Sequence, residues 1–164
     1  PFAVENLQNL RKLRLQACGN FRLSACAVLE ELWVDVNTRV FGGKQTFQIR
    51  NLERLERIML NIEENHLIGE LTLRDLPSLL FCGAQDGAVR KRVGVSSLHL
   101  KKLPRLQLFR IADEIQTQDV RMYRCPLLRA VPTLSLENDE EDFEHLEDFE
   151  NLQKVHRENI SGRR

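Results

Sequence analysis

The chain has 164 residues, the length of one domain, and its charges sum to zero. No apolar run reaches the ~18 residues that a membrane helix needs, so the sequence excludes a helical membrane span. No signal-peptide pattern opens the chain either. The charge is unevenly divided. Residues 1–136 carry 20 Lys/Arg and 14 Asp/Glu, a net +6, whereas residues 137–164 carry 4 and 10, a net −6.

A repeat is visible in the leucines, of which 25 of 27 precede residue 137. The stretch LTLRDLPSL at 71–79 is followed 27 residues later by LHLKKLPRL at 98–106, and 22 residues further on by VRMYRCPLL at 120–128. Apolar residues keep fixed positions while the residues between them vary, as in proteins whose repeats stack on one another. We therefore expect residues 1–136 to form an α/β solenoid. Its form would be an irregular leucine-rich-repeat horseshoe with a short parallel sheet on the concave face.

The first strands of this solenoid are expected on the N-terminal side of residue 40. The alternation of Leu13 and Leu15 has the period of two that is typical of a strand. The segment 29–40 fits LxxLxVxxNxxV in full and predicts the next strand, which starts at Leu32, 19 residues after Leu13.

The segment 40–68 does not fit one repeat phase. Strand patterns begin at Phe47, only 15 residues after Leu32, and at Ile58, only 13 residues before Leu71, whereas repeats of this class need about 20–29. We favour Ile58–Leu60 as the repeat strand and read the Phe47 segment as a convex-side element or an inserted hairpin. A helix over residues 50–59 is the alternative.

From Leu71 onward the phase is clear, with strands expected near 71–73, 98–100 and 120–123. Leu106, Leu108 and Ile111 predict a second short extended segment on the descending side. Leu134 and Leu136 predict a final strand.

The composition changes sharply after residue 136. Residues 137–142 are an acidic run, and apolar residues follow at spacings of three from Phe143 to Val155. We read 142–157 as a helix that covers the last apolar edge of the solenoid, followed by a flexible end. The acidic charge has two interpretations: a solvated tail that improves solubility, or a segment that folds back on the basic body or meets a basic partner.

The sequence contains no arrangement that points to catalysis, a cofactor or a metal. The four histidines are dispersed, and Gly42-Gly43-Lys44 lacks the flanking residues of a phosphate-binding loop. Cys18 and Cys125 each follow a predicted strand, where leucine-rich repeats place Asn or Cys to bond the turn. We expect reduced thiols, as in a cytoplasmic protein. The basic cluster 90–92 has no interleaved aromatics, so nucleic-acid binding is not expected.

The residues between the leucines of each predicted strand should point away from the core. Parallel stacking would align them on the concave face, where Trp, Met, Tyr and Arg have the composition of a protein-binding hot spot. The expected protein-binding residues are Arg14, Trp33, Met59, Thr72, His99, Lys101, Arg121 and Tyr123.

The units LTLRDLPSLLF at 71–81, LHLKKLPRLQLF at 98–109 and MYRCPLLRAVP at 122–132 resemble the irregular repeats of plant intracellular nucleotide-binding, leucine-rich-repeat disease-resistance receptors. The resemblance covers roughly residues 5–136. It implies recognition of pathogen effectors or of host proteins altered by them, and contacts that hold the receptor inactive. The nucleotide-binding and coiled-coil parts of such receptors are not in this sequence.

The sequence thus predicts a non-enzymatic protein-recognition module of a cytoplasmic plant immune receptor. Its partner would be an effector, a host protein or the receptor's own other domains. The alternative is the substrate-adaptor repeat domain of an F-box ubiquitin ligase, and the sequence upstream would decide between the two.

Overall fold

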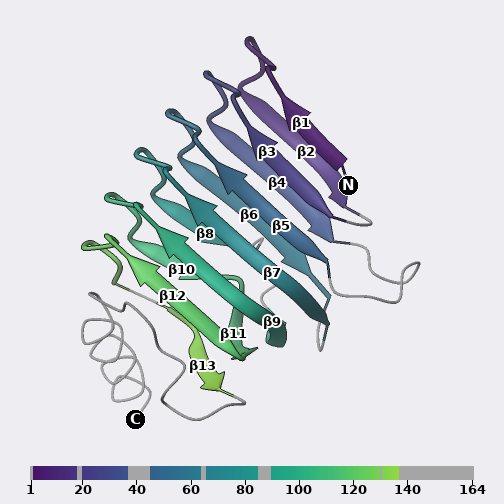
Figure 1. Cartoon of the computed structure of the whole chain (residues 1–164), viewed down its shortest axis with the longest axis vertical. Helices are drawn as coiled ribbons and strands as arrows, with labels where there is room; N and C mark the ends of the chain where they lie inside the picture. The colour runs from purple at the N-terminus through teal and green to yellow at the C-terminus, as the bar shows by residue number, and fades with distance from the viewer. Residues whose placement is uncertain are drawn as a thin grey trace.

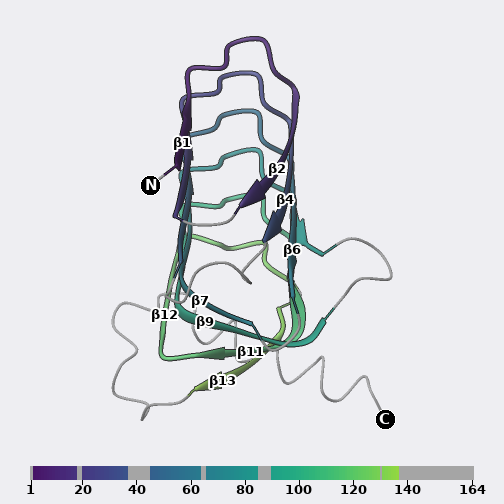
Figure 2. The ribbon, with the colours of Figure 1, turned by 90° about the vertical axis from the view of Figure 1, so that its right-hand side faces the viewer.

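The computed structural model describes residues 2–17, 20–36, 45–63, 66–84, 90–129 and 131–136. These residues form a solenoid of parallel strands in two sheets that face each other across one core (Figures 1 and 2). Sheet A contains β1 (Phe2–Glu5), β3 (Phe21–Ser24), β5 (Thr46–Arg50), β7 (Leu67–Arg74), β9 (Arg90–Lys101), β11 (Ala112–Thr117), β12 (Asp119–Tyr123) and β13 (Thr133–Leu136). Sheet B contains β2 (Lys12–Ala17), β4 (Glu31–Val36), β6 (Arg57–Ile62), β8 (Phe81–Gly83) and β10 (Leu108–Arg110).

Each repeating unit is a strand of sheet A, a tight corner and, in the first five units, a strand of sheet B. The corner begins with a residue of positive φ, which turns the chain sharply. In all but the first corner, where Leu7 is exposed, the next residue is apolar and lies in the core. In the next-to-last unit, Lys102 makes the turn at φ 55° and Leu103 is the apolar residue that follows. The six corner residues are Asn6, Ala25, Asn51, Asp75, Lys102 and Arg124.

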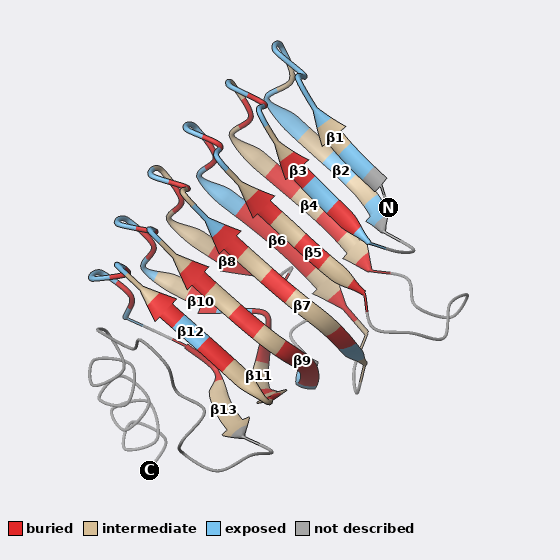
Figure 3. Cartoon of the chain, viewed as in Figure 1, coloured by how far each residue is buried: buried red, intermediate tan, exposed pale blue. Residues whose placement is uncertain are grey.

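Identical positions of successive units stack in register. Phe21 pairs with Phe47, Phe47 with Leu71, Leu71 with Leu98, and Leu98 with Val120. All five side chains are buried, and buried and partly exposed residues alternate along β4 and β5 (Figure 3). Stacking of like apolar residues therefore builds one continuous core, as solenoids require.

Toward the C-terminal end of the chain the solenoid gains a third side, which closes one edge between the two long sheets and is called the base here. The first half of β9 pairs with β11, whereas its second half pairs with β12. Figure 2 shows β11 and β13 crossing the base between the two long faces. At this bend Gly94 donates a hydrogen bond to the carbonyl of His66 at 2.6 Å. A Cβ at Gly94 would lie 2.6 Å from Leu67 Cδ1, so any larger residue here would require the exposed Leu67 side chain to move.

The expected strands exist, but they belong to two sheets. Those at Leu13, Leu32 and Ile58 are β2, β4 and β6 of sheet B, whereas those at 71–73, 98–100 and 120–123 lie in β7, β9 and β12 of sheet A. The prediction of a horseshoe with one concave sheet was wrong for the described residues, because both long sides are sheet. The described ranges contain no helix, and the predicted capping helix at 142–157 lies outside them.

Two strands in each unit also resolve the phase of the described residues between 45 and 68. Phe47 and Ile49 lie on β5 in sheet A, and Ile58 and Leu60 lie on β6 in sheet B. The Phe47 segment, read as a convex-side element or an inserted hairpin, is therefore a regular strand on the sheet opposite β6. Residues 50–59 form no helix and contain the corner between β5 and β6. The short extended segment near Leu108 and the final strand at Leu134–Leu136 were predicted correctly as β10 and β13.

The described cysteines are free and buried. The Cys125 thiol donates to the carbonyls of Leu100 and Tyr123, both at 3.6 Å, which confirms its expected role in a turn. Cys26 occupies the same corner position and bonds the carbonyl of Ser24 at 3.4 Å, while Cys18 lies outside the described residues.

Candidate binding surfaces

The structure divides the eight predicted binding residues between the two outer faces. Three lie on sheet B: Arg14, Trp33 and Met59. Five lie on sheet A: Thr72, His99, Lys101, Arg121 and Tyr123. Within each strand their neighbours belong to the core or pack against it, so the expected alternation is present. The two groups cannot contact one partner surface together, because the core separates the sheets.

On sheet B the outward residues form a row across three strands. Trp33 pairs in register with Met59, and Met59 pairs with Gly83. A Cβ on Gly83 would lie 2.6 Å from Phe81 Cζ, so the Phe81 ring covers this glycine. The ring therefore extends the row beyond Met59, and we call Trp33, Met59 and Phe81 the apolar strip.

Met59 is unusual because it points outward yet is only 6% exposed. Its neighbours Ile58 and Leu60 belong to the core, and Met59 does not. The strip is therefore packed on the outside of the sheet rather than being three isolated side chains. Thioether and aromatic groups packed in this way present an apolar surface that adapts to a partner.

Charged side chains flank the apolar strip and are paired with one another. Arg14 lies 5.8 Å from the Trp33 ring centroid and 3.2 Å from Asp35 Oδ2, and Lys12 lies 3.6 Å from Glu31 Oε2. Arg57 lies 5.6 Å from the Phe81 ring centroid. The hydrogen bond from Trp33 Nε1 lowers the pKa of Glu31, and the charges of Lys12 and Arg57 add to this effect while burial opposes it.

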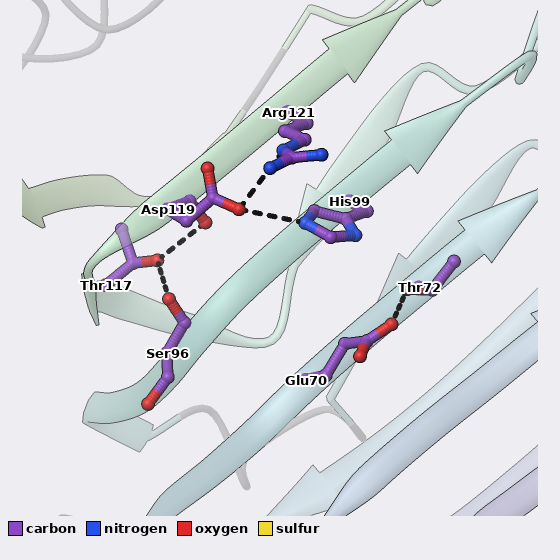
Figure 4. A network of polar contacts seen from close by, with 7 residues as sticks. All are labelled: Glu70, Thr72, Ser96, His99, Thr117, Asp119 and Arg121. Atoms are coloured by element: carbon purple, nitrogen blue, oxygen red, sulfur yellow. Dashed lines mark hydrogen bonds and ion pairs between the residues drawn. The ribbon is translucent and has the colours of Figure 1, made fainter. Parts of the chain in front are cut away.

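On sheet A the outward residues form a polar network (Figure 4). One carboxylate oxygen, Asp119 Oδ2, contacts His99 Nε2 at 3.1 Å and Arg121 Nε at 3.2 Å. On the neighbouring strand the Thr72 hydroxyl donates to Glu70 Oε1 at 2.6 Å. His99 is only 17% exposed, because Thr72 and Arg121 occupy the register positions on either side.

Next to this network, three cations stand directly opposite one another. Arg50 pairs in register with Arg74, and Arg74 pairs with Lys101. We call these three residues the basic ladder. Arg121 and Arg22 lie in the adjacent column, while Glu70 and Asp119 are the acidic residues on the outward positions of β3, β5, β7, β9 and β12.

Sequence reasoning missed Phe81 and Arg50. Phe81 ends the apolar run Leu79-Leu80-Phe81, which reads as core. Only the alternation of side chains along β8, in which the next residue Cys82 is buried, places Phe81 on the outer face. Arg50 lay in the Phe47 segment, which was read as a convex-side element or an inserted hairpin rather than as a repeat strand. The described residues hold no group of three or more His, Cys, Asp or Glu placed to bind a metal ion.

The described residues thus form a solenoid of parallel strands, with the apolar strip on the outer face of sheet B and the basic ladder on the outer face of sheet A. Within the described ranges, no helix is long and apolar enough to cross a membrane. No family model, curated protein or solved structure matches this chain.

Proposed function

We propose that the chain is a protein-recognition module and that the apolar strip of sheet B is its partner-binding surface. The observation that carries the proposal is Met59, which is packed on the outer face between Trp33 and the ring of Phe81. Binding hot spots are enriched in Trp and Arg, and Met is enriched in interface cores. Here Arg14, which pairs with Asp35, and Arg57 border the rings, so the two cations would lie at the edge of a desolvated centre.

The setting we propose is an intracellular plant immune receptor, in the cytoplasm. The units at 71–81, 98–109 and 122–132 support it, because their LxLxxLPxL and CPxLxxxP forms resemble the repeats of those receptors. In that setting the strip would contact a pathogen effector, a host protein altered by one, or another domain of the same receptor. The last contact would help to keep the receptor inactive.

A binding role is favoured over catalysis by how the polar groups are used. Asp119 is shared between His99 and Arg121, and Glu70 accepts from Thr72. On the other face, Asp35 accepts from Arg14 and Asn61. Carboxylates engaged in this way hold neighbouring side chains in place along the sheet.

The test is affinity capture from plant cell extract with the full chain, read by quantitative mass spectrometry. Trp33→Ala and Phe81→Ala should both lose the same captured proteins by about tenfold or more, as expected for hot-spot residues. Gln48→Ala, an outward residue on sheet A, should retain them. The idea fails if both strip variants capture the same proteins as the wild type.

Stability must be measured alongside, because Trp33 also has partners within the chain. Losing its hydrogen bond to Glu31 and the cation–π contact with Arg14 should cost about 1–3 kcal/mol. Circular dichroism on each variant establishes that capture is compared between folded samples.

A further inference from the structure

The basic ladder of sheet A places like charges opposite one another on neighbouring strands, where opposite charges are usual. Neighbouring strands lie about 4.8 Å apart, and like charges directly opposite one another destabilise the pair. Arg50, Arg74 and Lys101 place three cations in one such column. On sheet B the corresponding contacts are between opposite charges, as in Lys12–Glu31 and Arg14–Asp35.

The ladder is poorly neutralised by the described part of the chain. Arg74 contacts Asp75, which Lys102 also approaches at 3.8 Å. Within the described ranges no carboxylate pairs with Arg50 or Lys101. Arg50 Nε is moreover buried and has no hydrogen-bond partner there. A guanidinium N–H in this position needs an acceptor, and the surrounding cations favour an anionic one.

The chain itself contains a segment of matching charge. Residues 137–150 carry nine Asp/Glu and no Lys/Arg. They follow β13, whose last residue Leu136 pairs with Thr117 on β11. Thr117 also bonds the carbonyl of Asp119, the first residue of β12, so the acidic segment begins one strand away from the outer face of sheet A.

The segment is long enough to reach the ladder. Following β12 from Asp119 to Tyr123 covers about 13–17 Å, and the three strand spacings from Tyr123 to Arg50 add about 14 Å. Fourteen extended residues span up to about 46–50 Å. A short tether raises the effective concentration of the segment at this face into the millimolar range.

We propose that the acidic segment 137–150 lies across the outer face of sheet A and supplies the carboxylates that neutralise the basic ladder. It occupies the face that contains His99, Arg121 and Tyr123, and it competes there with any acidic ligand from outside. The inference does not depend on what binds the apolar strip of sheet B.

Zero-length cross-linking of the full chain with a water-soluble carbodiimide tests this contact. The reagent joins a lysine to a carboxylate only where the two touch. Lys101 should couple to residues 137–150 at low salt, and this product should largely disappear at 0.5 M salt, where the Debye length is about 4 Å. Lys12 should couple to Glu31 under all conditions, since their charged atoms already lie 3.6 Å apart.

Two variants with equal loss of charge sharpen the test. Arg50→Gln with Arg74→Gln should lower the Lys101 product about threefold or more, the change expected for losing two exposed ion pairs. Arg11→Gln with Arg110→Gln, away from the ladder, should leave it unchanged.

Three results would overturn the proposal. The first is the absence of any Lys101 product while the Lys12–Glu31 product forms. The second is equal yield in both double variants. The third is a product that joins two molecules, which mixing ¹⁵N-labelled with unlabelled chain reveals, because the contact would then lie between copies.

Discussion

Replacing Phe47 and Ile58 separately by alanine tests the two-sheet architecture. Phe47 is 1% exposed on β5 of sheet A, and Ile58 is fully buried on β6 of sheet B. In a horseshoe with one sheet, only one of these segments would contribute a repeat strand. In the observed solenoid both side chains fill the same core from opposite sides.

The expected losses follow from the size of the groups removed. Truncation of a buried Phe to Ala costs about 3–5 kcal/mol, and of a buried Ile about 2–5 kcal/mol. Phe47 stacks in register between Phe21 and Leu71, with its ring centroid 6.5 Å from that of Phe21, so the neighbours have little freedom to fill the space. With a urea m-value of about 2 kcal/mol/M, Phe47→Ala should lower the midpoint by about 1.5–2.5 M.

The assay is urea unfolding followed by far-ultraviolet circular dichroism, with Gln48→Ala as the control. Gln48 lies between Phe47 and Ile49 but points outward and is half-buried, so its loss should stay within about 1 kcal/mol. If either Phe47→Ala or Ile58→Ala costs less than about 1 kcal/mol, one of the two strands is not part of the core and the reasoning is refuted.

Three further variants probe the corners, the strip and the base. Ala25→Gly should stabilise the fold by up to about 1 kcal/mol in urea unfolding, because Ala25 has a φ of 55°, whereas Ala27→Gly in the same turn should not stabilise it. A loss of stability in Ala25→Gly would contradict the corner geometry. Gly83→Ala should cost about 1–3 kcal/mol and weaken partner capture, because the new Cβ would lie 2.9 Å from the Arg110 carbonyl oxygen and displace the Phe81 ring; unchanged stability would show that the ring does not cover Gly83. Burial lowers the pKa of His66 below 6.5, with the charge of Glu63 opposing, so the unfolded chain takes up a proton at a higher pH than the folded chain does. Stability should therefore fall as the pH drops from 7 to 5, and His66→Gln should flatten that slope. Equal slopes in the two proteins would exclude His66 as the cause.

Sequence alone identified most inward-facing residues but not the sheet to which each strand belongs. Strands of both sheets alternate with a period of two, so Leu13 and Leu71 look alike although they face the core from opposite sides. What separates them is the corner that follows a strand of sheet A. Asn51 and Asp75 are typical residues for positive φ, but Lys102 and Arg124 are not, so the corner was hidden in two of the three clear repeats.

The candidate site was predicted in part for the same reason. Trp33 and Met59 were recognised as outward neighbours, and their register pairing confirms that they are adjacent. Tyr123 and Lys101 were assigned to the same surface as Trp33 and Met59 only because one sheet was assumed. Whether any of these residues binds a protein stays a prediction, while their division between two faces follows from the pairing of the strands.

The two outer faces differ in a way that the fold itself does not require. The core fixes every second residue of each strand through stacking, whereas the outward columns are free to vary. A sequence under pressure only for solubility and stability would place opposite charges across neighbouring strands on both faces, since such pairs stabilise a sheet. Sheet B follows this rule around its apolar strip, where Arg14 forms an ion pair with Asp35 and Lys12 with Glu31. The basic ladder of sheet A breaks it, and its unmatched charge is the reason to expect an acidic ligand there rather than open solvent.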